Sequence, residues 1–253
     1  MADSFIHILN GDSLHEQFPV DLTGATLVFN ECLIEGPKGA DDLGVFFESR
    51  EGYLSDTYDS SIKHAYRTDL VVPLLNIEMN SDELEIVLWF EEDLFCQTNF
   101  WFVCHFLNIC GFQGRVSWAK PFGPAKYSFG RLSRGSLRTV FKERLPVDPS
   151  KIAPLWQAYS LDDSDELIRY VESLSDLSEY ILPAAIAFRD MNTSSIEQSR
   201  PYLSLVEIMR SLNTLNFGEV FIEFCQKEAV YGLGDLQVKR LFDEVIKKNQ
   251  DFF

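Results

Sequence analysis

The sequence predicts an α/β fold, in which a mostly parallel, Rossmann-like sheet with crossover helices is followed by a mainly helical C-terminal region. Two observations predict it. Short β-rich runs alternate with longer helical segments early in the chain, and no convincing strand follows Pro146. Strand–helix–strand alternation at this spacing is typical of parallel sheets. We therefore expect an α/β domain over 1–125 and a helical domain over 126–253.

Four segments of the first domain read as strands because they are short and mostly continuous apolar runs, as in a sheet covered on both faces. They are residues 5–9, 26–30, 85–90 and 115–118. Between them we expect helices near 41–54, 59–76 and 93–110.

The second domain carries helix signals throughout. Pro149 stands where a first helical turn would begin, and residues 162–165 are an acidic helix opening. Apolar residues recur at helical spacing from Leu203, and a last helix is expected from Asp235, after a Gly-Leu-Gly turn. A winged-helix-like unit is one arrangement open to residues of about 200–250, but they lack the basic recognition helix of a DNA-binding protein.

The composition excludes several classes of protein. The chain has 253 residues, 46% of them hydrophobic, and a net charge of −17. This charge repels nucleic acid and anionic membranes. The N-terminus lacks a signal-peptide pattern, and polar residues interrupt the apolar stretch 94–112, which therefore reads as a buried helix. We expect a cytoplasmic protein with no membrane partner.

The cysteines argue for the same compartment. There are 5 of them, an odd number, and no Cys-x-x-Cys pair occurs. This spacing fits neither a zinc site nor a disulfide framework. Buried thiols in a reducing cytosol are the expected state.

The segment Gly11-Asp12-Ser13-Leu14 spells the signature of the GDSL esterases. A nucleophilic serine needs a base, and that family supplies it in a late Asp-x-x-His motif. No histidine follows His105 in this chain, which argues against such a triad. The segment reads better as a strand-to-helix turn, with Gly11 in the turn and Asp12 or Ser13 capping the helix. A free helix N-terminus there could also bind phosphate.

Carboxylates follow two further strands. Glu31 comes directly after the second strand, with Glu35 four residues later, and the third strand is followed by Glu91 and Asp93. Solvated loops and favourable charges in a first helical turn are sufficient structural reasons for them. Ligands of open α/β sheets, however, bind at the carboxyl ends of strands, often where the strand order reverses. Gln97, four residues after Asp93, is expected on the same helix face.

The segment 121–145 is basic, with 6 basic residues and 1 acidic residue. Its arginines interleave with aromatic residues, as in a phosphate-binding surface. They also suit a second role, in which they neutralise the acidic first domain from within the same molecule. Arg131, Arg134 and Arg138 are the candidate anion partners.

Three motifs occur in a characteristic order: His7-x-x-x-Gly11-Asp12-Ser13, Glu31-Cys-Leu-x-Glu35-Gly-Pro, and Leu88-Trp-Phe-Glu-x-Asp93-Leu-Phe-Cys-Gln97. Over roughly residues 5–120 the chain resembles a bacterial family of domains of unknown function. The tail more loosely resembles the helical region that accompanies this domain. The resemblance implies that the two regions occur together, and it implies no activity.

Two classes of function follow. The first is a small-molecule or phosphate-ester binding protein, hydrolase or transferase with its site at the strand ends. Its catalytic or divalent-cation (such as Mg²⁺) groups would be Asp12, Glu31, Glu35, Glu91 and Asp93, and its ligand-binding groups Gly11, Ser13, Gln97, Arg131, Arg134 and Arg138. The second class is a non-catalytic interaction or regulatory module that acts through the helical C-terminal region.

Overall fold

The computed structural model describes residues 4–39 and 42–249. Their strands form a five-stranded sheet in the order β2-β1-β3-β4-β5. The strands are β1 (Ser4–Leu9), β2 (Ala25–Val28), β3 (Leu84–Trp89), β4 (Arg115–Ala119) and β5 (Leu145–Val147). The first four pair in parallel, and β5 pairs antiparallel to β4. The predicted α/β class with a mostly parallel sheet is confirmed.

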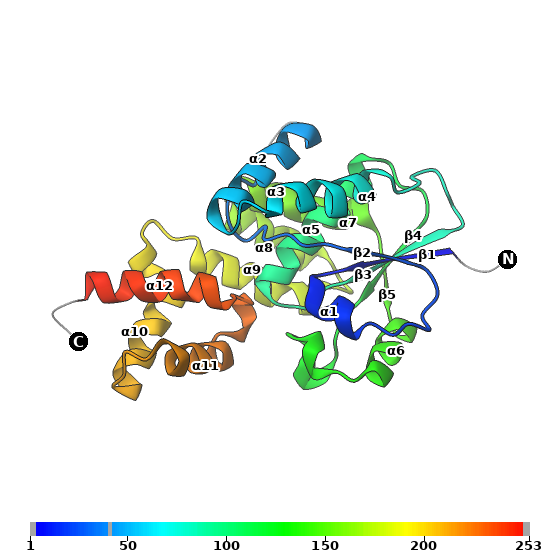
Figure 1. The fold of residues 1–253 in the computed structure, drawn as a ribbon. Helices are drawn as coiled ribbons and strands as arrows, with labels where there is room; N and C mark the ends of the chain where they lie inside the picture. Colours follow the sequence, from blue (N-terminus) through cyan, green and yellow to red (C-terminus); the bar gives the residue numbers. More distant parts are fainter. Residues whose placement is uncertain (1–3, 40–41, 250–253) are drawn as a thin grey trace. The chain divides into compact units, whose positions relative to one another are not determined.

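The chain changes direction across the sheet at its centre. From β1 it moves outward to β2, then returns to the opposite side of β1 to form β3. The strand order therefore reverses between β1 and β3. Figure 1 shows helices on both faces of the sheet, with α1 (Asp12–Gln17) and α6 (Arg134–Lys142) on one face and α5 (Leu94–Ile109) on the other.

Alternating side chains of the strands build the two cores. Leu9, Val87 and Trp89 pack with Leu14 of α1 and Leu137 of α6 on one face. On the other face Phe100 of α5 stacks on Trp118, with ring centroids 4.8 Å apart. Phe102 of α5 packs in turn against Phe46 and Trp156. Strands buried on both sides explain the nearly continuous apolar runs.

The remaining elements of this part connect the strands, except the last of them, which follows β5. They are α2 (Leu43–Thr57), α3 (Ile62–Ala65), the π-helix η1 (Tyr66–Val71), α4 (Val72–Leu75), the 3-10 turns η2 (Gly123–Ala125) and η3 (Phe129–Arg131), and α7 (Pro149–Ser160). Asp42 caps α2 by accepting a bond from the Val45 amide, and residue 41, where this helix was predicted to begin, lies outside the described residues. The strand β5 was missed because it is short and contains Pro146.

The C-terminal part is helical, as predicted. It contains α8 (Ser164–Ser173), α9 (Ser178–Met191), η4 (Ile196–Gln198), α10 (Arg200–Leu212), α11 (Phe217–Lys227), η5 (Ala229–Tyr231) and α12 (Asp235–Lys248). Leu205, Met209, Phe224 and Phe242 belong to one core shared by α10, α11 and α12. The last helix begins at Asp235, as predicted, and the winged-helix-like arrangement stays a prediction.

The chain divides into two compact units. The first comprises residues 1–92 and 96–163, and the second comprises 93–95 and 164–253. This division falls at 163/164, whereas the sequence placed a boundary at 125/126, because β5 and α7 belong to the α/β unit. Among the described residues, no helix is both long and apolar enough to cross a membrane.

Candidate functional site

Side chains from the ends of neighbouring strands meet through hydrogen bonds. Asn10, which follows β1, donates from Nδ2 to Cys96 Sγ at 2.9 Å. Its Oδ1 accepts from Asn99 Nδ2 at 2.9 Å, and the same Asn99 amide donates to the carbonyl of Glu31 at 2.9 Å. Asn99 also accepts from the Leu33 amide at 3.2 Å. The first turns of α5 thus join the ends of β1 and β2.

Glu91, which follows β3, lies next to Asn10 in this network. Its Oε2 accepts from Cys96 Sγ at 3.2 Å, and its Oε1 accepts from the Phe129 amide at 3.2 Å. Burial raises the pKa of Glu91 above its usual range, while the bonds from Phe129, Cys96 and Asn10 oppose part of that rise. The carboxyl group therefore lies at the reversal of the strand order with a perturbed proton affinity, as acid–base groups often have.

A separate polar pair links the segments that follow β1 and β2. Asn30 is exposed and donates from Nδ2 to both carboxylate oxygens of Asp12, at 3.1 and 3.0 Å. Gly11 has φ +87°, and α1 starts at Asp12. The prediction that Asp12 or Ser13 caps this helix is wrong, because Gly11 occupies the cap position and no side chain bonds there. Asp12 and Ser13 are exposed.

Glu31 has a different environment from Glu91. Its carboxylate is buried and accepts from Arg50 Nε at 3.0 Å, Arg50 Nη2 at 2.6 Å, Tyr66 Oη at 2.7 Å and the Cys32 amide at 2.8 Å. Arg50 is fully buried. Burial by itself would lower the pKa of Arg50, but the charge and the hydrogen bonds of Glu31, with smaller contributions from Tyr66 and Cys32, together outweigh it and raise that pKa. The pair is a structural anchor.

Arg50 also organises the loop after β2. It donates to the carbonyls of Cys32 at 2.9 Å, Glu35 at 2.5 Å and Pro37 at 3.3 Å. The Glu35 carboxylate instead accepts from Tyr58 at 2.7 Å and Tyr53 at 3.5 Å. Glu31 and Glu35, expected as a possible pair, thus have separate hydrogen-bond partners. Burial raises the pKa of the Cys32 thiol between them to about 11, so it is protonated at neutral pH.

The two remaining acid and amide candidates lie at the start of α5. Gln97 is fully buried, and its Nε2 donates to the carbonyl of Glu91 at 2.7 Å while its Oε1 has no partner among the described residues. Asp93 is buried and belongs to the second unit, where its Oδ1 lies against Gly232. The structure therefore places Gln97 next to Glu91, whereas Asp93 belongs to the other unit.

The arginines of the basic segment differ in their contacts. Arg138 forms a bidentate pair with Asp21, at 2.8 and 2.5 Å. Arg134 Nε donates to the carbonyl of Gln17 at 3.3 Å. Arg131 is exposed in η3, two residues after the Phe129 amide that bonds Glu91. Neutralisation of the acidic part of the first unit is confirmed for Arg138, and Arg131 is the arginine nearest in sequence to the cluster.

Several residues of this region were not candidates in the sequence analysis: the asparagines Asn10, Asn30 and Asn99, the thiol Cys96 and the buried Arg50. Asn10 and Asn30 could have been found, because each ends a strand as the acids do. Cys96 was expected only as one of the buried thiols, and it is buried, but its bonds to Asn10 and Glu91 were not foreseen. Nothing in the sequence distinguishes Arg50 from a surface arginine. The described residues bring together no group of three or more His, Cys, Asp or Glu side chains suited to a metal ion.

Comparison with known proteins assigns neither a family nor a function to this chain. No protein family, no curated protein and no solved structure matches this chain. The resemblance to a family of domains of unknown function stays a prediction, and the function is argued from the site alone.

Proposed function

We propose that the first unit binds a small polar molecule, in the class of phosphate esters, at the carboxyl ends of β1, β2 and β3, as Rossmann-like sheets do. One observation carries the proposal. Glu91 lies at the reversal of the strand order, within a network that links Asn10, Cys96 and the Phe129 amide. If the polar residues served only as helix caps and turns, no half-buried carboxyl group would be required at the reversal of the strand order.

The network supports acid–base chemistry. A carboxyl group whose pKa is raised by burial keeps its proton to higher pH than an exposed carboxyl group and can pass that proton to a leaving group, as a hydrolase or transferase requires. The Cys96 thiol donates to that carboxyl and is a second group able to exchange a proton with it. Arg131 would meet a phosphate oxygen, and the exposed Asp12 would be the carboxylate that holds a hydrated Mg²⁺.

A thermal-shift screen of nucleotides, sugar phosphates, Mg²⁺ and Mn²⁺ tests the proposal, because a ligand that binds only the native state raises its stability. A hit should shift the wild type, and Glu91→Gln should lose most of that shift while its own melting temperature stays at or above the wild-type value. Glu143→Gln, at an exposed acid on another part of the unit, is the matched control and should behave as the wild type.

Glu31→Gln tests whether Glu31 stabilises the fold without taking part in ligand binding. It removes a buried carboxylate that the structure commits to Arg50, so it should lower the melting temperature and leave the ligand-induced shift in place at temperatures where it is folded. Equal loss of the shift in the Glu31 and Glu91 variants would contradict the proposal.

A screen without hits would favour the second class, a non-catalytic interaction module acting through the helical C-terminal region. Ile222 of α11 and Leu236 of α12 are 61% and 56% exposed, respectively. They are the first positions at which to test a partner-binding role, by measuring whether Ile222→Glu or Leu236→Glu abolishes capture of that partner.

A further inference from the structure

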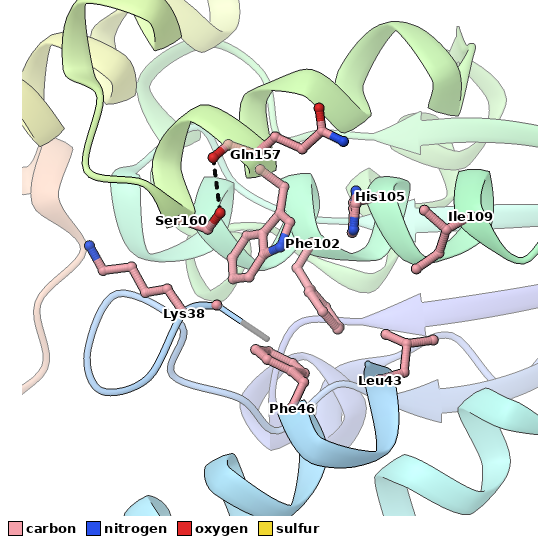
Figure 2. A pocket seen from close by; sticks show the side chains of 10 residues that line it. Lys38, Leu43, Phe46, Phe102, His105, Ile109, Gln157 and Ser160 are labelled. Atoms are coloured by element: carbon pink, nitrogen blue, oxygen red, sulfur yellow. Dashed lines mark hydrogen bonds between the residues drawn. The ribbon is translucent and has the colours of Figure 1, made fainter. Parts of the chain in front are cut away.

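A cavity of about 490 Å³ lies in the first unit, away from the strand ends. Its walls come from α2, α5 and α7, and Figure 2 shows their side chains around it. The volume falls within the range of about 300–1,000 Å³ that small-molecule sites occupy. On α5 the cavity residue His105 lies nine positions after Cys96, about 13 Å along the axis at 1.5 Å per residue. The cavity is therefore separate from the proposed strand-end site.

Three aromatic rings form the apolar part of the wall. Phe46 stacks on Phe102 with ring centroids 4.8 Å apart, and Trp156 meets Phe102 edge-on at 5.0 Å and Phe46 at 6.0 Å. All three side chains are buried and line the cavity. Aromatic rings gain beyond their buried area when another ring packs in an offset or edge-to-face arrangement. A planar aromatic guest would extend this packing of rings.

Two polar groups at the cavity have no partner within the described residues. The Nδ1 atom of His105 is buried without a hydrogen bond, although buried polar atoms are nearly always satisfied. The side-chain amide of Gln157 is exposed at the cavity and can both donate and accept. Burial lowers the pKa of His105, so the imidazole is neutral at pH 7.

The charges argue against an ionic guest. Lys38, the cation of the lining, already forms an ion pair with Asp162 and lies over the ring of Tyr159 at 4.4 Å. No Asp or Glu is among the described residues that line the cavity. A neutral imidazole and an amide therefore supply the polar recognition.

We propose that this cavity binds a neutral, planar heteroaromatic molecule of about the size of benzimidazole or a purine base. The guest would pack against Phe46, Phe102 and Trp156, and a ring nitrogen would bond His105. A second ring nitrogen would meet Gln157. The guest would bond the imidazole at Nε2, because Nδ1 is buried out of its reach.

Benzimidazole and indole are suitable probes because they share one shape and differ by one ring nitrogen. Binding of both compounds is measured by isothermal titration calorimetry. We expect benzimidazole to bind the wild type more tightly than indole, which lacks the acceptor for Gln157. His105→Phe keeps a ring and removes the nitrogen, so it should weaken benzimidazole binding about tenfold, the worth of about 1.4 kcal/mol.

Controls make the result specific. His64→Phe changes an exposed histidine of the same unit and should leave Kd unchanged. Gln157→Leu, at an exposed position, should weaken benzimidazole severalfold and remove its advantage over indole, even if His105→Phe fails to fold. Glu91→Gln should have no effect. The proposal is overturned if neither compound binds, if His105→Phe or Gln157→Leu binds benzimidazole like the wild type, or if Glu91→Gln abolishes binding.

Discussion

Replacing Arg50 by Met should destabilise the first unit strongly. The change deletes the donors of five hydrogen bonds, two to the Glu31 carboxylate and three to the carbonyls of Cys32, Glu35 and Pro37. It leaves a buried carboxylate with only Tyr66 and the Cys32 amide as donors. Breaking a buried pair by removing one partner costs about 3–5 kcal/mol. At about 2–4 °C per kcal/mol for a chain of this size, the melting temperature should fall by roughly 10 °C.

Urea denaturation followed by tryptophan fluorescence is the appropriate assay. All 4 tryptophans of the chain lie in the first unit, so the signal reports its unfolding. Arg67→Met is the matched control, since Arg67 pairs with Glu51 through a side chain that is 60% exposed. Exposed pairs contribute about 0–1 kcal/mol, and the control should lose no more than that.

A double-mutant cycle distinguishes the pair from the loop contacts. Arg50→Met with Glu31→Gln should cost less than the sum of the single variants, because the double variant has no unpaired buried charge. A loss below about 1 kcal/mol for Arg50→Met, or additive losses in the double variant, would refute the assignment of this pair as a structural anchor.

Three other predictions concern single side chains. Because the pKa of Glu91 is raised, the native state binds the Glu91 proton more tightly than the unfolded state does. The contribution of Glu91 to stability is therefore lost as pH rises from about 4.3 through the native pKa. Over that range the free energy of unfolding of Glu91→Gln, measured by urea titration, should rise relative to that of the wild type. Arg144 and Ser117 lower the pKa of Glu85 against the opposing effect of burial. The contribution of Glu85 to stability is therefore present above about pH 4.3 and is lost on acidification. Glu85→Gln should make the free energy of unfolding less dependent on pH on the acid side, and an unchanged pH dependence would contradict this. Gly232→Ala should destabilise the second unit by about 1–3 kcal/mol by calorimetry, because Gly232 has φ +65° and a Cβ there would lie 2.0 Å from Asp93 Oδ1; a neutral effect would show that Asp93 can move away.

The apolar strands were predictable because burial on both faces leaves a direct record in the sequence. All four parallel strands appear within a residue or two of the predicted positions, as does the start of α12. The antiparallel β5 left no such record, since its pairing to β4 depends on a return of the chain that no local pattern encodes. The predicted boundary at 125/126 was too early for the same reason. Trp156 of α7 packs against Phe102 of α5, and no local sequence pattern encodes this tertiary contact.

The candidate site could be predicted in outline and less well in detail. Strand ends pointed to Glu91 and Asp12, and the network places Gln97 beside Glu91. Sequence position could not separate Glu91 from Glu31, since each follows an apolar run that predicts a strand. Their environments differ because Arg50 lies on a helix whose buried face is set by tertiary packing.

The two outer strands of the sheet have a consequence for association with other chains. An exposed strand edge presents unpaired backbone groups on which another chain can add a strand. Here β2 has 4 residues, and β5 has 3 with Pro146, which lacks an N–H, at its centre. Neither edge offers a long regular row of donors and acceptors, so the sheet resists edge-to-edge growth and aggregation without needing a covering helix.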